Sequence, residues 1–201
     1  MPKEAKSNKW QDHYTRRAKK EKYPARSVYK LQEIQKKHNL IQKGHKVLDL
    51  GCSPGSWLIY AARQTGSSGK VVGIDLKPVS IQVPSHVEVL SVDVLNIDPG
   101  TLDKGFNVVL SDMAPATTGN KTVDAARSIN LCESALHIAK TVLVPGGSFV
   151  CKVFQGSDFN SFSEEIRTAF KVRKIFKPRS SRKESKEIFI IGLGCKKESE
   201  I

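Results

Sequence analysis

The sequence predicts an α/β domain built on a doubly wound, mostly parallel sheet. Short apolar runs typical of strands alternate along the chain with stretches whose apolar residues recur at helical spacing. A Gly-rich turn follows the first of these strands, which is where such folds place a ligand. The chain of 201 residues is long enough for one domain of this class with a full apolar core.

The individual elements follow from the same patterns. The expected strands span residues 46–50, 70–75, 87–91, 106–111, 148–153, 172–176 and 187–193. The expected helices span residues 57–64, 123–143 and 161–170. A further short helix begins near Ser27, because Val28, Leu31 and Ile34 share one helical face. Pro145-Gly146-Gly147 should stop the long helix that precedes it.

No internal repeat or long linker divides the chain, so we expect a single domain with two short extensions. Residues 1–22 form a basic N-terminal arm, of which residues 1–9 are a mobile tail. Residues 23–196 form the domain itself, and residues 197–201 are a C-terminal tail.

Composition argues against several other classes of protein. The four cysteines form no CxxC pair and have no His-x-x-x-His partner, which favours reduced thiols and no metal site. No apolar run approaches the roughly 18 residues of a membrane span. The N-terminus lacks the apolar core of a secretory signal. We therefore expect a cytoplasmic protein without membrane or metal. The oligomeric state stays open, with a monomer favoured.

The net charge of +13 is confined to two segments. Residues 1–46 carry 14 Lys/Arg against 4 Asp/Glu, and residues 171–186 carry 8 against 1. A generic solubilising surface would spread its charge more evenly, whereas segregated basic segments are typical of proteins that bind a phosphate backbone. We expect RNA to dock on these two segments. An acidic membrane surface is the main competitor, but no helix with a broad apolar face accompanies the lysines.

The turn after the first strand has the sequence Gly51-Cys52-Ser53-Pro54-Gly55-Ser56-Trp57. Its glycines let the backbone approach a ligand closely, but it has neither the Lys-Ser/Thr of a P-loop nor the G-x-G-x-x-G of dinucleotide sites. Asp75 closes the second strand, where an acid accepts hydrogen bonds from ribose hydroxyls and repels a 2′-phosphate. Asp93 follows the third strand, within reach of an adenine amino group. The alternative for each aspartate is a purely structural role as a helix N-cap.

Several motifs carry a family resemblance. Asp49–Gly55 resembles the first motif of class I methyltransferases, which bind S-adenosylmethionine. Together with RSVYKL (26–31), SDMAP (111–115), CKVFQG (151–156) and Ser185-Lys186-Glu187, it is similar to the FtsJ/RrmJ family of ribose 2′-O-methyltransferases, from about Trp10 to Gly194. The resemblance implies a Rossmann-like, doubly wound class I methyltransferase fold, with a mostly parallel seven-stranded sheet whose last strand is antiparallel.

The resemblance also implies a site. It implies a catalytic tetrad at Lys30, Asp112, Lys152 and Glu187. It implies S-adenosylmethionine as cofactor, contacted at Gly55, Trp57, Asp75, Asp93 and Asp112. Residues 52–56 depart from several relatives, which have small residues or a second glycine there. Because that loop faces the cofactor through its backbone, we expect the same chemistry.

Lys152 is unusual on physical grounds as well. It lies within the apolar strand SFVCKVF, where burying an amine is costly unless the amine has a function. The alternative is a lysine that extends from the strand end to solvent. A 2′-hydroxyl is a poor nucleophile until it loses its proton, and a neutral lysine can accept that proton. We therefore expect Lys152 to be the general base, Asp112 to orient it, and Lys30 and Glu187 to hold the ribose.

The function predicted from these motifs is 2′-O-methylation of RNA, with a uridine of large-subunit (23S) ribosomal RNA as the favoured target. Transfer RNA and mRNA caps are the alternative substrates. A nucleotide-dependent oxidoreductase would need the tighter glycine fingerprint, which the turn lacks. A non-catalytic RNA-binding module would have no use for Lys152.

Overall fold

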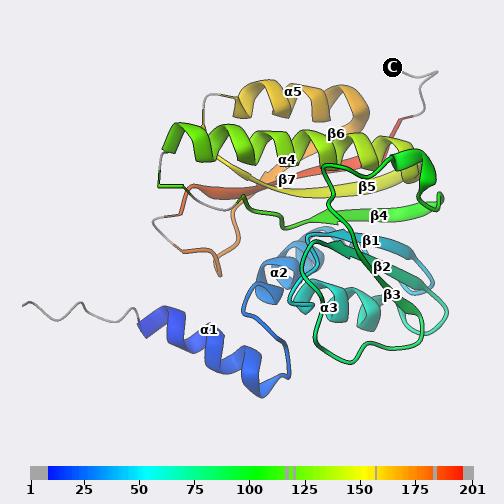
Figure 1. Cartoon of the computed structure of the whole chain (residues 1–201), viewed down its shortest axis with the longest axis vertical. Coiled ribbons are helices and arrows are strands. Elements are labelled where there is room, and N and C mark those ends of the chain that lie inside the picture. Colours follow the sequence, from blue (N-terminus) through cyan, green and yellow to red (C-terminus); the bar gives the residue numbers. More distant parts are fainter. Residues whose placement is uncertain (1–8, 116–117, 120, 157, 183–184, 197–201) are drawn as a thin grey trace, which may run out of the picture.

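The computed structural model describes residues 9–115, 118–119, 121–156, 158–182 and 185–196 of the chain. Its centre is a seven-stranded sheet in the order β3-β2-β1-β4-β5-β7-β6 (Figure 1). The strands are β1 (Lys46–Leu50), β2 (Lys70–Asp75), β3 (Val87–Ser91), β4 (Phe106–Ser111), β5 (Leu143–Phe154), β6 (Phe170–Phe176) and β7 (Glu187–Cys195). All seven predicted strands are therefore confirmed.

The sheet is parallel except for β7. The pairs β1–β2, β1–β4, β2–β3 and β4–β5 are parallel, whereas β7 lies between β5 and β6 and is antiparallel to both. The antiparallel last strand implied by the resemblance is confirmed. Its direction matters, because β7 begins at the sheet edge where the parallel strands end, and Glu187 is its first residue.

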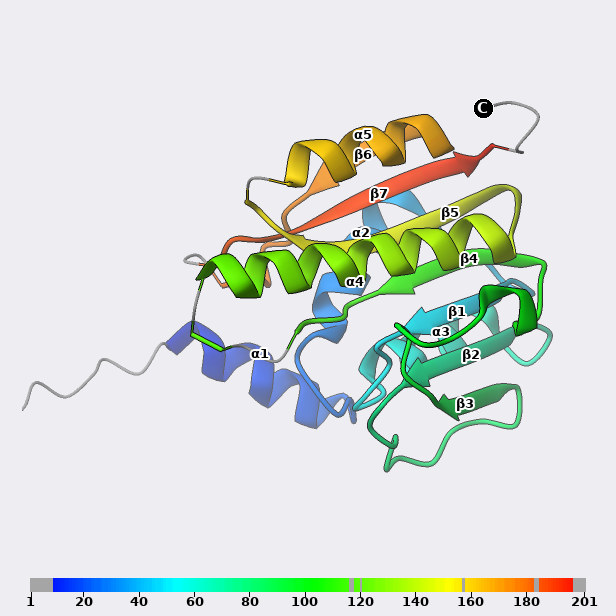
Figure 2. The ribbon, with the colours of Figure 1, turned by 45° about the horizontal axis from the view of Figure 1, so that its top comes forward.

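Helices cover both faces of the sheet, as expected for a doubly wound fold. Figure 2 shows α4 (Lys121–Val142) and α5 (Phe159–Ala169) on one face, and α2 (Val28–His38) and α3 (Ser56–Thr65) on the other. Each face has its own apolar core. Leu136 and Phe162 belong to the cluster under α4 and α5, and Leu31 and Leu58 to the cluster under α2 and α3. A 3-10 turn, η1 (Pro99–Thr101), precedes β4.

The start of β5 lies earlier than predicted. Helix α4 ends at Val142, next to the predicted stop, but the strand already begins at Leu143 rather than at Ser148. Leu143 pairs with Phe106, and the register then shifts before Ser148 pairs with Val108. Gly146 within this irregularity has a φ of +82°, which is why turn residues interrupt the strand there.

Helix α1 (Lys9–Lys20) was not predicted. It packs through Ala18 and Tyr14 against Tyr29 of α2, with the Tyr14 and Tyr29 ring centroids 5.2 Å apart. Trp10, Tyr14 and Ala18 recur every four residues, so the signal was present, but the surrounding lysines and arginines made the segment resemble an unstructured arm. The predicted tails lie outside the described residues, except that Lys9 is the first residue of α1.

Candidate active site

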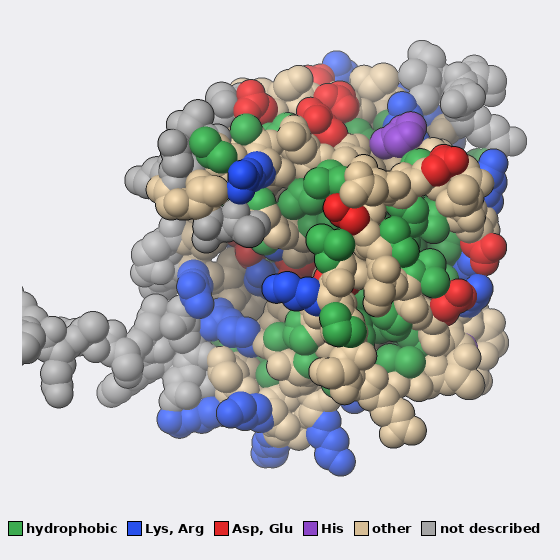
Figure 3. Space-filling model, viewed as in Figure 1, with side chains coloured by type: hydrophobic (Ala, Val, Ile, Leu, Met, Phe, Trp, Pro, Cys, Tyr) green, Lys and Arg blue, Asp and Glu red, His purple; other side chains and the backbone are tan. Residues whose placement is uncertain are grey.

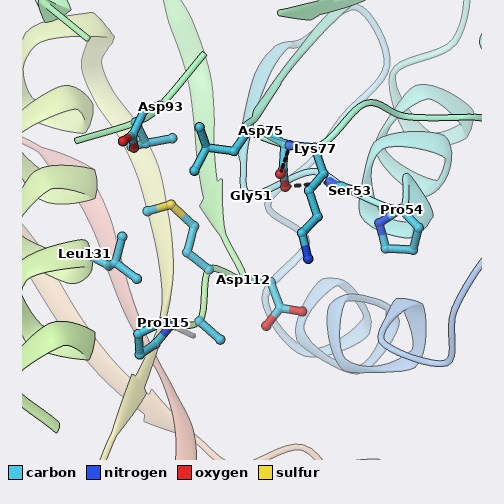
Figure 4. Close-up of a pocket in the computed structure, with 13 residues that line it drawn as sticks. Gly51, Ser53, Pro54, Asp75, Lys77, Asp93, Asp112, Pro115 and Leu131 are labelled. Atoms are coloured by element: carbon cyan, nitrogen blue, oxygen red, sulfur yellow. Dashed lines mark hydrogen bonds between the residues drawn. The ribbon is translucent and has the colours of Figure 1, made fainter. Parts of the chain in front are cut away.

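A pocket of about 580 Å³ opens where β1, β2, β3 and β4 end. Figure 4 shows Asp75, Asp93 and Asp112 around it, each following a different strand. Lys77 and Ser53 also line it, and the remaining side chains are apolar, among them Leu76, Val94, Met113, Pro115 and Leu131. Carboxylates set in an apolar wall suit a ligand with a flat apolar part, hydroxyl or amino donors, and a positive charge.

The two acids predicted to hold the nucleoside are themselves held by turns. Asp75 accepts hydrogen bonds from the backbone N–H groups of Ser53 (2.9 Å) and Lys77 (2.8 Å), shown as dashed lines in Figure 4. Asp93 accepts from the N–H of Leu95 at 3.0 Å and from the amide of Asn96 at 3.1 Å. Each carboxylate has about four acceptor positions, so both retain acceptors for a ligand.

Glycine is required at Gly51, which lines the same pocket. Its φ is +76°, and a Cβ there would come within 2.5 Å of Met113 Cγ. A side chain would therefore disturb the pocket wall as well as strain the backbone.

Gly55 and Trp57 do not line this pocket. Gly55 has a φ of +108°, and a Cβ there would meet Ile81. The Trp57 side chain is buried, stacks near Phe189, and donates its indole N–H to the carbonyl of Ser27 at 2.9 Å. The indole therefore anchors the start of α2 against α3. That Gly55 and Trp57 contact the cofactor stays a prediction.

The four predicted tetrad residues lie together beside the pocket. Lys152 Nζ is 3.1 Å from Asp112 Oδ1 and donates to the Asp112 carbonyl at 2.7 Å. Lys30 Nζ lies 2.8 Å from both carboxylate oxygens of Glu187 and 4.0 Å from Asp112 Oδ1. Their side chains are only 7–15% exposed. Two cations and two anions thus form one nearly buried cluster, contributed by α2, β4, β5 and β7.

Glu187 is the anion of this cluster whose protonation is clearly affected. Burial alone would raise its pKa, but the charge and hydrogen bond of Lys30, the charge of Lys152 and a hydrogen bond from Ser181 outweigh it, so the pKa lies below the usual range. Ser181 Oγ donates at 2.9 Å, and the Glu187 N–H donates to Ser185 Oγ at 3.1 Å. Glu187 is therefore a fixed carboxylate that holds Lys30.

Asp49 lies close to the site, near Asp112 and Asp75, and the sequence alone assigns it no separate role. It lies in β1, fully buried, and neither of its carboxylate oxygens has a hydrogen-bond partner among the described residues. Burial, and then the negative charges of Asp112 and Asp75, raise its pKa well above the usual range. Its place in the motif D-x-G was visible in the sequence, but its lack of partners was not.

The two basic segments meet in the structure. Glu33 of α2 accepts hydrogen bonds from the backbone N–H groups of Arg179 (2.7 Å) and Ser180 (2.9 Å), and Arg26 donates to the Ser180 carbonyl at 2.8 Å. Figure 3 shows Lys and Arg side chains gathered toward the lower left, on the side of α1. Lys46, in contrast, begins β1 at the far end of the sheet and bonds Asp103, so the segment 1–46 is not uniformly part of this surface.

The family model for FtsJ-like methyltransferases matches residues 23–195. The chain belongs to this family. Its fold is therefore that of a methyltransferase.

Individual relatives of this methyltransferase agree with the family model. It is 55% identical over 194 residues to the ribosomal RNA large subunit methyltransferase E of Desulforapulum autotrophicum, covering 95% of this chain and 96% of that one. It is also 55% identical over 198 residues to the protein of the same name from Desulfosudis oleivorans, covering 96% and 95%. A crystal structure from Plasmodium falciparum, assigned as a ribosomal RNA methyltransferase, superposes with a TM-score of 0.74 at 27% identity, covering 86% and 98%.

The described part of the methyltransferase contains neither a candidate metal centre nor a candidate membrane span. Among the described residues, no three His, Cys, Asp or Glu side chains are grouped so that they could hold a metal ion. Within the same part of the chain, no helix has both the length and the apolar character to cross a membrane.

Proposed function

We propose that this protein transfers the methyl group of S-adenosylmethionine to a ribose 2′-hydroxyl of RNA, with a uridine of large-subunit ribosomal RNA as the target. The observation that carries the proposal is the placement of Lys152. Its side chain is 7% exposed, and its amine lies 3.1 Å from Asp112 Oδ1, beside a pocket lined by acids. The names of the two relatives that share 55% identity support ribosomal RNA as the substrate.

The pocket fits the proposed cofactor. Asp75 would accept from the two ribose hydroxyls, and Asp93 would accept from the adenine amino group. Leu76, Val94 and Leu131 offer apolar contact for the base. Asp112 would favour a positively charged ligand beside the tetrad. When bound there, S-adenosylmethionine supplies an activated methyl group, so the protein has to position the nucleophile and remove its proton.

The tetrad residues divide that work. Lys152 Nζ accepts the proton of the 2′-hydroxyl, which requires the amine in its neutral form. Asp112 fixes the position of the amine through its carboxylate and its carbonyl oxygen. Lys30, clamped by Glu187, would donate hydrogen bonds to the ribose or its phosphate. With the cofactor bound, the bond from the methyl carbon to sulfur would break as the bond to the 2′-oxygen forms, the thioether would leave, and Lys152 Nζ would hold the proton of the hydroxyl.

The test of this proposal is methyl transfer under single-turnover conditions, with saturating enzyme and large-subunit RNA from cells that lack the protein. Lys152→Ala should lose at least the 10²–10⁴ in rate that general-base catalysis typically contributes. Lys152→Arg should fail almost as badly, because a guanidinium keeps its proton. Lys43→Arg, an exposed position outside the pocket and tetrad, is the matched control.

Two outcomes would contradict the assignment. Near-normal single-turnover rates in Lys152→Arg would make the lysine an electrostatic support, and the base would lie elsewhere. Mapping of 2′-O-methyl positions in total RNA, with and without the protein, tests the substrate. A change confined to transfer RNA would exclude the ribosomal target while leaving the chemistry intact.

A further inference from the structure

A second cavity, of about 830 Å³, lies between α1, α2 and the end of β6. Its wall combines aromatic and basic side chains from both basic segments. The aromatic side chains are Tyr14, Tyr29 and Phe176, of which Tyr29 is buried, and the basic ones are Arg17, Lys36, Lys37 and Arg179. We call this cavity the aromatic groove. It is separate from the acid-lined pocket and shares no lining residue with it.

The electrostatics of the aromatic groove favour a polyanion. Its lining contains four basic side chains, whereas the acid in the lining is Glu33. Both carboxylate oxygens of Glu33 already accept backbone hydrogen bonds, from Arg179 at 2.7 Å and from Ser180 at 2.9 Å. This carboxylate therefore holds the 178–180 turn in place, and the remaining charge of the groove is positive.

The aromatic rings alternate with these cations. Lys37 Nζ lies 4.8 Å from the centre of the Phe176 ring, and Arg26 Cζ lies 5.5 Å from the centre of the Tyr14 ring. Both rings are partly exposed. A basic groove with aromatic side chains is the arrangement by which proteins bind single-stranded nucleic acid, because the rings stack on bases and the cations contact the phosphates.

Two buried groups next to the aromatic groove have unused hydrogen-bonding capacity. Arg26 Nη2 donates to the Ser180 carbonyl at 2.8 Å, but Arg26 Nη1 and Ser180 Oγ have no partner among the described residues. Ser180 is 1% exposed. These atoms do not line the groove, so they mark unused hydrogen-bonding capacity beside it rather than a surface that a ligand contacts.

The aromatic groove is connected to the tetrad. Tyr29 lines the groove, and the next residue of α2, Lys30, belongs to the tetrad. Ser180 is followed by Ser181, whose hydroxyl donates to Glu187 at 2.9 Å. The two sites are thus separated by about the width of one helix, roughly 10 Å. A strand whose ribose lies at Lys152 would reach the groove within a nucleotide or two.

We propose that the aromatic groove binds an unpaired nucleotide of the RNA strand that carries the target ribose. The base stacks against Tyr14 and Phe176, and its phosphate is held by the cations of the lining. This inference rests on the proposed function, since it takes RNA as the substrate. It adds that recognition needs a base as well as phosphates, at a place distinct from the tetrad.

The test uses the full-length protein without cofactor and compares two fluorescent RNA strands by anisotropy. One is an oligouridylate of about ten nucleotides, a length within the range that such grooves bind. The other is an abasic strand of the same length and charge. Phe176→Leu and Tyr14→Leu should each weaken oligouridylate binding by roughly 5- to 150-fold, the range of base–aromatic stacking. Abasic binding and the dependence on salt should stay within twofold of wild type.

Matched variants separate stacking from charge and from folding. Tyr14→Phe keeps the ring and should bind oligouridylate like wild type. Lys36→Ala removes a cation and should weaken both strands equally, with a flatter dependence on salt. Lys104→Ala, exposed and outside both basic segments, should change neither. Because Tyr14 and Phe176 come from α1 and β6, a local folding defect in α1 would not be shared by both variants.

Equal binding of oligouridylate by wild type and both leucine variants would overturn the inference. So would an equal loss for both strands, since the rings would then support only the shape of the surface. Neither result would touch the proposed function, which depends on methyl transfer by Lys152. If the Lys152 variants kept their activity, the assignment of the base would fail, but the binding comparison would still test the groove.

Discussion

The buried carboxyl of Asp49 makes a specific prediction about stability and pH. The side chain is fully buried in β1, and its oxygens have no hydrogen-bond partner in the described part of the chain. Burial raises its pKa, and the nearby charges of Asp112 and Asp75 raise it further. Folding therefore retains a proton that the unfolded chain, with a pKa of about 3.9, releases.

The sign of the effect follows from this difference. The stabilising contribution of a raised pKa is fully present below the unfolded-state pKa and is lost as the pH rises through the folded-state pKa. Between the two values, wild type should lose up to about 1.4 kcal/mol of unfolding free energy for each pH unit. Asp49→Asn removes the titrating group. The difference in unfolding free energy between wild type and variant should therefore change with pH at this slope.

The measurement is urea unfolding of both proteins at a series of pH values from about 4 to 7. Other groups titrate in both proteins, so their contributions cancel in the difference. Asp103→Asn is the control, because hydrogen bonds from Lys46 and Lys70 lower the pKa of that exposed carboxyl. Its difference from wild type should be flat in this range. Parallel stability curves for wild type and Asp49→Asn would refute the reasoning, since Asp49 would then be charged in the folded state.

Two further predictions concern ligands. Asp75→Ala removes the expected acceptor for two ribose hydroxyls and should cost roughly 1.5–3 kcal/mol of S-adenosylmethionine binding by calorimetry; unchanged affinity would place the adenosine elsewhere. Deleting residues 1–22 removes α1 and with it Tyr14 and Arg17, so RNA binding should weaken and its dependence on salt should flatten. Cofactor affinity should barely change, and an unaltered salt slope would show that this arm is not a docking surface.

The sheet could be predicted from the sequence because local patterns determine it. Each strand from Lys46–Leu50 to Glu187–Cys195 is a short run rich in β-branched or aromatic residues, and all of them form in the structure. Elements without a strong apolar pattern were less predictable. Helix α1 has few apolar residues, and the early start of β5 depends on pairing with Phe106, which is remote in sequence.

Less of the site than of the sheet could be predicted from the sequence. Patterns alone placed Asp112 and Lys152 at one sheet edge, whereas bringing Lys30 to Glu187, 157 positions away, required the family resemblance. Trp57 shows a different limit, since its indole packs in the core and bonds Ser27. The aromatic groove could not be predicted from the sequence, because Tyr14 and Phe176 are far apart along the chain. They line one cavity in the fold, where Glu33 and Arg26 contact the 178–180 turn.

The arrangement of charge explains why the tetrad combines two lysines with two acids. The proposed cofactor is a cation and RNA is a polyanion, so their binding surfaces need opposite potentials while the reacting atoms must meet. The pocket supplies Asp75, Asp93 and Asp112, and the aromatic groove supplies Arg17, Lys36, Lys37 and Arg179. The tetrad lies between these regions, with Lys152 paired to the acid on the pocket side and Glu187 paired to Lys30 on α2. Because the two lysines and two acids balance, the cluster adds little to the repulsion between either region and the ligand of the other. The raised pKa of Asp49 acts in the same direction, because it opposes a further negative charge close to Asp112.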